Sequence, residues 1–501
     1  MTARLKPLAS SHDGSALWFV LALLLSRWVV SVVLMPASGA GLGDTEAYYT
    51  AWSYALASGY HDHPGVLAWS IALSRAIFGD MLMSTRMVPA LYQGVTLLFL
   101  LRVWRRSLDE EKLMWAAALF VAIPIFGTGG LLASPDAPLA AAWAGTLWLV
   151  VRARDDGDWC LVGLGLAIAV ASKWFGLVLL GAVWVEVWLG TREGESRAVR
   201  CYRFLMVGGL AGLGLLPQLW FEQAHQWTGL RYHAFERHIG SVVTIEHVFG
   251  MLGSHLLVMS PILLCLLIRA LWFAGETDGE RQAKRLTLLT LLPMVCITLL
   301  TREAEPHWPV LGWLPMLGIV IERHSERSRG WLLSGLAVGV VLQGLLWLHV
   351  MSPLLMERVP VDSYVPRYDL ANDLLGWESV GEVAKAKLLS GEVDRVTSYH
   401  YTMCGQLAAA IEGVDSVFCA SRRRDAFDQL LDGVTGRGVQ GERLLYVRDN
   451  RYDEKGSQRL RCDAWGEEET LITSRGGREV HRFGLSICQG YRGLVTESEL
   501  E

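Results

Sequence analysis

Charged residues are scarce in this sequence of 501 residues: Asp, Glu, Lys and Arg make up 19% of it, below the roughly 25% of an ordinary soluble domain. Lysine and arginine form no long block and the formal net charge is -5, so we expect no general attraction to nucleic acid. The sequence contains no CxxC pair of the zinc-binding type and no glycine-rich loop of the nucleotide-binding type. These absences argue against a nucleic-acid-binding, zinc-ribbon or nucleotide-binding protein.

Apolar residues take the place of the missing charge, at 52% of the sequence and with a mean hydropathy of +0.31. Lipid is therefore the expected solvent. Allowing for runs shorter than the roughly 20 residues of a full span, the sequence predicts a polytopic α-helical membrane protein with about eleven transmembrane helices. They are expected near residues 16–35, 86–104, 113–126, 137–153, 159–172, 174–190, 203–221, 247–273, 286–300, 309–322 and 330–351.

The basic residues indicate the orientation of these helices. One set of alternate connections holds most of the lysines and arginines, whereas the opposite set holds only Arg75, Arg86, Lys173, Arg231, Arg237 and Arg302. Because cytoplasmic loops carry the excess of positive charge, the poorer set is expected on the outer side. With eleven spans, the C-terminus also lies outside.

The pattern changes after residue 351, so we expect a membrane domain at 1–351 and an extracytoplasmic α/β domain at 352–501. In the second part the short apolar runs RVTSYHY, SVFCAS, RLLYVRD and HRFGLSICQGY alternate with the helical-looking ESVGEVAKAKLL and AFDQLLDGV. Its four cysteines, Cys404, Cys419, Cys462 and Cys488, could pair in an oxidising compartment. The pairing itself cannot be read from the sequence.

The first outer connection carries two acidic motifs, GDTEAYY at residues 43–49 and GYHDHPG at residues 59–65. The motifs place Asp44 and Glu46 close to the membrane and put Asp62 between two histidines. Ionisable groups next to lipid are costly and usually serve a function. We therefore interpret this connection as part of a reaction centre.

Four further outer loops carry single charged groups or small clusters. One of them, FEQAHQWTGLRYHAFERH, holds Glu222, Arg231 and His233 and could simply form a surface helix beside the membrane. Asp136 in ASPDAP could catalyse or could simply cap the helix that follows. Lys173 in ASKWFG could bind an anion or could reach to the membrane interface. The last loop, TREAEPHWP, contains Arg302, Glu305 and His307.

Together these outer groups suit the transfer of a group from an anionic lipid. A carboxylate is needed to accept a proton from the acceptor hydroxyl, and cations are needed to neutralise the departing phosphate. A flippase or transporter of lipid-linked sugars is an alternative, although only Arg27 and Glu186 are expected within the membrane and no internal repeat is evident. An inactive partner subunit of another transferase is a third possibility.

The motifs GDTEAYY, GYHDHPG, LLASPDAPL, ASKWFG, PQLWFEQAHQW and EPHWP, in this order, resemble the bacterial GT-C glycosyltransferases of the protein O-mannosyltransferase superfamily. This group includes the lipid A aminoarabinose transferase and the dodecaprenyl-phosphate galacturonic acid transferases. The resemblance covers about residues 15–420. It implies a multi-pass protein of the bacterial inner membrane that takes a sugar from a polyprenyl phosphate on the periplasmic face, without a cofactor or metal.

The resemblance also implies roles for individual residues. Asp44 is expected to be the general base, with Glu46 as the alternative, and Asp136 to be a supporting catalytic carboxylate. Asp62, His63, Lys173 and Arg302 are expected on the donor-phosphate side, and Tyr48, Glu305 and His307 in the rest of the substrate site. The acceptor is expected to be a hydroxyl of an envelope lipid, a glycan or a protein.

Overall fold

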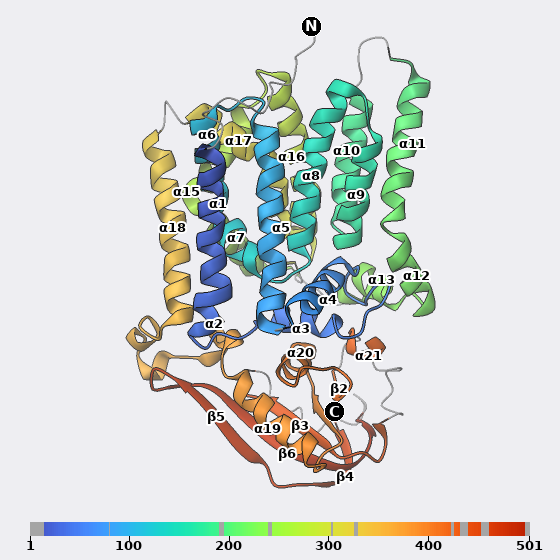
Figure 1. Ribbon diagram of the computed structural model, residues 1–501, viewed down its shortest axis with the longest axis vertical. Coiled ribbons are helices and arrows are strands. Elements are labelled where there is room, and N and C mark those ends of the chain that lie inside the picture. Colours follow the sequence, from blue (N-terminus) through green and yellow to red (C-terminus); the bar gives the residue numbers. More distant parts are fainter. Residues whose placement is uncertain are drawn as a thin grey trace.

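The computed structural model describes residues 15–79, 81–189, 195–238, 243–301, 304–324, 329–421, 425–430, 439–451 and 460–495. A bundle of long helices occupies one end of the molecule and a β-sheet the other, with short helices between them (Figure 1). The bundle contains α1 (Ser15–Trp28), continued by η1 (Val29–Leu34) and α2 (Met35–Ala37), then α5 (Met81–Trp104), α6 (Glu110–Ala122), α7 (Pro124–Gly127), α8 (Asp136–Asp156), α9 (Cys160–Ser172), α10 (Gly176–Leu189), α11 (Arg197–Leu213), α14 (Ile245–Met259), α15 (Pro261–Phe273), α16 (Asp278–Leu300), η4 (Trp308–Met316), α17 (Leu317–His324) and α18 (Arg329–Met351).

The predicted apolar runs lie on helices of this bundle, except that the run 203–221 continues from α11 into the short helix α12 (Leu216–Ala224). Three helical stretches of the described residues, Ser15–Ala37, Leu82–Trp104 and Arg329–Met351, are individually long and apolar enough to cross a membrane, and the number rises to six if each bent helix pair is one span. The structure therefore has several apolar spans. The count of eleven remains a prediction.

Three of the predicted spans are broken, which the hydropathy pattern did not indicate. The bends between α6 and α7 with the turn after it, between α11 and α12 (Leu216–Ala224), and between α14 and α15 are 87°, 52° and 95°. Pro124 and Pro261 begin the helices after two of these bends. The residue before a proline is disfavoured in helical conformation, and Ile123 is extended while Ser260 has a φ of 65°.

The two charges expected within the membrane have partners on neighbouring helices. The Arg27 guanidinium donates to the side-chain oxygen of Gln343 at 2.9 and 2.7 Å, and Arg285 donates to the Glu186 carboxylate at 2.8 Å. A charge in an apolar bundle needs such a partner. Both groups therefore join helices together, α1 to α18 and α10 to α16.

The C-terminal part is built on a six-stranded mixed sheet with the order β2-β1-β3-β6-β4, and β5 also pairs with β6. β1 is parallel to β2 and β3, whereas β6 is antiparallel to β3, β4 and β5. The four expected strands and the helix over ESVGEVAKAKLL are confirmed, whereas part of AFDQLLDGV lies outside the described residues. The elements are η5 (Met356–Arg358), η6 (Val361–Ser363), η7 (Pro366–Tyr368), η8 (Leu370–Leu374), α19 (Trp377–Leu389), β1 (Arg395–Ser398), α20 (Tyr401–Ala410), β2 (Val417–Cys419), α21 (Phe427–Leu430), β3 (Leu444–Asp449), β4 (Leu460–Trp465), β5 (Glu469–Arg475) and β6 (Arg478–Leu494).

Short helices lie between the bundle and the sheet: α3 (Asp44–Trp52), α4 (Val66–Phe78), α12, α13 (Thr228–Ala234) and the turn η3 (Glu236–His238), with another turn, η2 (Gly129–Leu131), before α8. Helix α20 of the C-terminal part packs directly on α3. A Cβ atom at Gly405 would lie 2.7 Å from the Cα atom of Tyr48, so only glycine permits this approach. Tyr48 and Cys404 also belong to one buried hydrophobic cluster. The bundle end and the C-terminal part therefore share a core.

The four C-terminal cysteines form two disulfides. Cys404 of α20 pairs with Cys419 of β2, and Cys462 of β4 pairs with Cys488 of β6. The first disulfide holds α20 against the sheet, and the opposite side of α20 rests on α3. Cys404 and Cys419 are both buried.

Candidate active site

Helix α3 starts at Asp44 because the adjacent Gly43 and the nearby Glu46 supply the cap. Gly43 is extended, with φ -70° and ψ 162°, and its N–H donates to Oε2 of Glu46 at 3.1 Å. A glutamate at the third helical position commonly accepts from the N-cap backbone in this way. Asp44 and Glu46, two residues apart on the helix, therefore point to different sides.

Glu46 points into the protein. Its Oε1 atom accepts from the backbone N–H of Ala133 at 3.2 Å, and its Oε2 atom lies 3.6 Å from Arg86 Nη2. The side chain is 2% exposed. Both oxygens thus join α3 to the segments around it, one of them to the loop that leads into α8.

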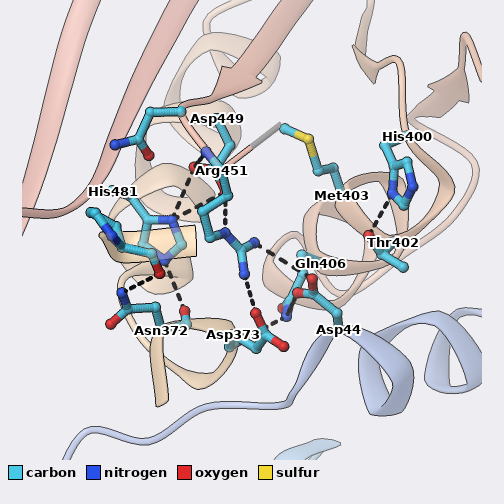
Figure 2. A network of polar contacts seen from close by, with 12 residues as sticks. Asp44, Asn372, Asp373, His400, Thr402, Met403, Gln406, Asp449, Arg451 and His481 are labelled. Atoms are coloured by element: carbon cyan, nitrogen blue, oxygen red, sulfur yellow. Dashed lines mark hydrogen bonds and ion pairs between the residues drawn. The ribbon is translucent and has the colours of Figure 1, made fainter. Parts of the chain in front are cut away.

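Asp44 points instead toward the C-terminal part (Figure 2). Its Oδ1 atom accepts from Gln406 Nε2 at 2.9 Å, and its Oδ2 atom lies 3.5 Å from Arg451 Nη2. The side chain is 12% exposed. Asp44 is the more accessible of the two acidic groups on α3.

Asp136, the first residue of α8, does not cap that helix. The N-cap residue is Pro135, and no side chain caps the backbone there. Both carboxylate oxygens of Asp136 accept from Lys173 Nζ, at 2.9 and 2.8 Å, and His307 Nε2 lies 3.4 Å away. Lys173 is buried at the end of α9, so the structure rules out its extension to the membrane interface.

The loop with Asp62 and His63 folds back beside α3, closed by a single bridge between Gly59 and Pro64. The hydroxyl of Tyr48 donates to Asp62 Oδ2 at 2.6 Å, and His233 of α13 lies 3.8 Å from the other oxygen. Asp62 and Tyr48 are both buried. The loop is therefore fixed to α3 and α13 through its aspartate.

His63 is influenced by the charges of two groups of residues, Asp136 with Lys173 and Asp62 with His233. Burial lowers its pKa well below the usual histidine value, and the charges of Lys173 and His233 lower it further, against the effects of Asp62 and Asp136. His63 is therefore neutral at neutral pH and is no substitute for a permanent cation. Its coupling to Asp136, Lys173 and Asp62 places these groups in one region at the sheet-facing end of the bundle.

The structure describes only part of the last predicted loop, and Arg302 lies outside the described residues. Glu305 is exposed, and the contact described for it is made by its backbone carbonyl, which accepts from the N–H of Trp308 at 3.0 Å. Of that loop, His307 alone among the described residues reaches Asp136.

The sequence did not identify the partners that the C-terminal part provides to Asp44. Gln406 and Arg451 are more than 360 residues away along the chain, and neither belongs to a recognisable motif. A partly buried Asp373, which contacts Arg451, was also missed. Among these three residues, the sequence contains a signal only for Arg451. It lies just after the apolar strand β3, and polar groups are common where strands of a sheet end.

Comparisons with known proteins bear on the family and the fold of this chain. Residues 62–221 match the family described as dolichyl-phosphate-mannose-protein mannosyltransferase. The undecaprenyl phosphate-alpha-4-amino-4-deoxy-L-arabinose arabinosyl transferase 2 of Pseudomonas fluorescens is 23% identical over 260 residues, which are 46% of this chain and 42% of the relative. The chain thus spans less than half the length of the curated relative it matches.

Solved structures extend the fold similarity to nearly the whole chain. ArnT from Cupriavidus metallidurans bound to undecaprenyl phosphate is similar with a TM-score of 0.62 and 14% sequence identity, over 94% of this chain and 98% of that chain. The apo form of the same protein gives a TM-score of 0.63 and 15% identity, over 95% and 98% of the two chains. The similarity establishes a shared fold that includes the C-terminal sheet.

Proposed function

We propose, from the match of residues 62–221 to the dolichyl-phosphate-mannose-protein mannosyltransferase family and from the fold shared with ArnT, that this chain is a membrane glycosyltransferase using a polyprenyl-phosphate sugar. The observation that carries the proposal is the convergence of separate outer-loop charges at one end of the bundle. Asp44 and Asp62 come from the first outer connection, and Asp136 and Lys173 come from two further loops. The elements that carry them, α3 with the loop after it, the start of α8 and the end of α9, all lie at the sheet-facing end of the bundle (Figure 1). An active site for a lipid-linked donor needs this position beside the membrane.

The proposed reaction is an in-line displacement at the anomeric carbon of the sugar. The acceptor hydroxyl oxygen forms the new bond to that carbon while its proton passes to Asp44. The bond between the anomeric carbon and the phosphate oxygen breaks, and its electron pair leaves with the polyprenyl phosphate. The anomeric configuration is inverted.

Asp44 is proposed as the base because it differs from Glu46 in what surrounds it. Glu46 binds two backbone N–H groups and faces Arg86, so its lone pairs are already used by the fold. Asp44 has a partly accessible side chain at the first turn of a helix. A general base must reach the proton that it removes.

The donor phosphate is proposed to lie beside Lys173. Lys173 is a buried cation whose charge is shared with Asp136, which also faces His307, and an ammonium in such a site attracts an anionic leaving group. For His63, which burial keeps neutral, we propose a hydrogen bond to the substrate. Undecaprenyl phosphate, the ligand in the ArnT structure from Cupriavidus metallidurans, is the lipid class that we propose for this chain.

The site and the C-terminal part are proposed to face the periplasm. The excess of basic residues in the opposite loops supports this orientation, and the two disulfides suit an oxidising compartment. A reporter enzyme fused after residue 420 is expected to be active only outside the cytoplasm. Activity of this fusion in the cytoplasm would reverse the proposed orientation.

The acceptor is proposed to be an envelope lipid, a glycan or a protein hydroxyl. Mass spectrometry of the glycolipids and glycoproteins of a deletion strain tests the function whatever the identity of the sugar. We expect at least one species to lose a single sugar mass in that strain and to regain it when the wild-type chain is restored. Identical spectra for the deletion strain and its parent would contradict a transferase function.

A further inference from the structure

A polar network joins Asp44 to three segments of the C-terminal part (Figure 2). Gln406 comes from α20, Asp373 from the turn η8, and Arg451 from the residues just after β3. Arg451 and Gln406 are both buried. The carboxylate proposed as the base is thus enclosed by residues from outside the helical bundle.

Arg451 is shared among three carboxylates. Its Nε atom donates to Asp449 at 2.6 Å, its Nη1 atom donates to Asp373, and its Nη2 atom lies 3.5 Å from Asp44. The guanidinium also lies over the ring of Trp377, 5.6 Å from the ring centre. A guanidinium held at this many points has little freedom to turn away from Asp44.

Gln406 fixes the other oxygen of Asp44. Its Nε2 atom donates to Asp44 Oδ1 at 2.9 Å and faces the backbone oxygens of Leu42 and Asp373, each at 3.0 Å. The neighbouring Gly405 sets α20 against the backbone of α3, and the disulfide at Cys404 holds α20 to the sheet. The amide is therefore placed by the packing of two helices.

Asp449, which holds the far side of Arg451, is itself held from behind. His481 Nδ1 lies 3.1 Å from both oxygens of Asp449, and His481 Nε2 lies 2.9 Å from the backbone oxygen of Asn372. The side chains of His481 and Asp449 are 0% exposed. A chain of contacts therefore runs from His481 on β6 through Asp449 and Arg451 to Asp44. A simple surface contact between two domains would not need such a chain of buried polar groups.

We propose that Arg451 and Gln406 are positioning residues for Asp44, so that the C-terminal sheet domain is a working part of the active site. This inference rests on the proposed function, in which Asp44 is the base. Gln406 and Arg451 would hold the carboxylate in one orientation. Arg451 divides its contacts among three carboxylates, so Asp44 is oriented without taking all of the guanidinium's charge.

The protonation state of Asp373 changes how the charge of Arg451 is divided among the three carboxylates. Burial raises the pKa of Asp373 to about 6, and the nearby charges of Asp44 and Asp449 raise it while those of Arg451 and His481 lower it. Below this pH Asp373 is neutral, and Arg451 is left to two carboxylates instead of three. Arg451 then interacts more strongly with Asp44 and holds the carboxylate back from the acceptor hydroxyl, so transfer is expected to slow as the pH falls through about 6.

The test uses the full-length protein purified in detergent, together with solubilised membranes from a strain that lacks it. The release of polyprenyl phosphate is followed between pH 5 and pH 9. Arg451→Met is expected to lower kcat by about 10- to 100-fold, since a misplaced catalytic group costs this much. Without the guanidinium, the charge of Asp373 no longer alters a contact at Asp44, so the change of rate near pH 6 should also be lost, while the donor concentration at half-maximal rate stays close to the wild-type value.

Two variants at the same site keep the test independent of folding. Arg451→Lys retains the charge and is expected to recover part of the rate. Asp373→Asn keeps the shape of the side chain, and it should remove the loss of rate near pH 6 and hold transfer at the slow, acid level throughout. Arg492→Met, which removes an exposed arginine paired with Asp463 in the same domain, should leave the rate and the pH profile unchanged.

The outcomes separate the inference from the proposed function. Wild-type rates and pH profiles in both Arg451→Met and Asp373→Asn would overturn the positioning role while leaving the transferase intact. If Arg451→Met does not fold, a wild-type pH profile of the transfer rate in Asp373→Asn would still overturn the positioning role. A wild-type protein that releases no polyprenyl phosphate would overturn the proposed function itself.

Discussion

Replacing Asp44 with Asn is expected to lower the rate of sugar transfer by about 10²- to 10⁴-fold, the usual contribution of a general base. The amide has the same shape but cannot accept the proton of the acceptor hydroxyl. Gln406 and the start of α3 remain in place, so the fold and the affinity for the donor lipid should change little. The measurement is the initial rate of polyprenyl phosphate release, with the binding of undecaprenyl phosphate measured on the same preparation.

Glu46→Gln provides the matched comparison on the same helix. Glu46 caps α3 and faces the buried Arg86, so this variant should lose thermal stability yet keep a transfer rate near wild type per folded molecule. The opposite pattern, with full activity in Asp44→Asn and none in Glu46→Gln, would move the base to Glu46.

Removing the carboxylate of Asp136 is expected to have the largest effect on stability. Asp136→Asn leaves the ammonium of Lys173 buried beside a neutral amide, and an uncompensated charge of this kind costs on the order of 3 kcal/mol once the partial exposure of Asp136 is allowed for. Denaturant unfolding of the protein in detergent measures the loss. Transfer should fall as well, because Lys173 loses the group that orients it.

The double variant Asp136→Asn with Lys173→Met tests the origin of this loss. With both charges gone, no unpaired ion remains, so most of the lost stability should return while transfer stays low. If the double variant is as unstable as the sum of the two single variants, the pair is not coupled. That result would assign the buried contact no role in holding α8 to α9.

Much of the fold could be predicted because lipid imposes a simple rule on the sequence. Apolar runs had to be helices, and alternating runs bounded by turns indicated the strands now seen as β1, β2, β3 and β6. The bends at Pro124 and Pro261 were missed because hydropathy averages over them. Helix α20 was missed because YTMCGQLAAA is short, and its stability depends on packing against α3.

The arrangement of the candidate site residues was predictable where they come from one motif and unpredictable where they come from distant segments. The different surroundings of Asp44 and Glu46 follow from the start of a helix at Gly43, since residues two apart on a helix do not face the same way. The sequence left Asp136 as a possible helix cap and Lys173 as a possible residue of the membrane interface. Their pairing is evident only in the packed structure, where the start of α8 meets the end of α9. Arg451 reaches Asp44 only through tertiary structure, which no local pattern records.

The most direct test of the proposed transferase function is whether the purified protein consumes a polyprenyl-phosphate sugar. Solubilised membranes of the deletion strain hold the unused donor and the unmodified acceptor together, so purified protein can be added to them even while both are unidentified. We expect the wild-type protein to convert the polyprenyl-phosphate sugar into free polyprenyl phosphate and Asp44→Asn to do so at least 10²-fold more slowly, as followed by mass spectrometry of the polyprenyl lipids. An unchanged pool of polyprenyl-phosphate sugar after addition of folded wild-type protein would contradict the account.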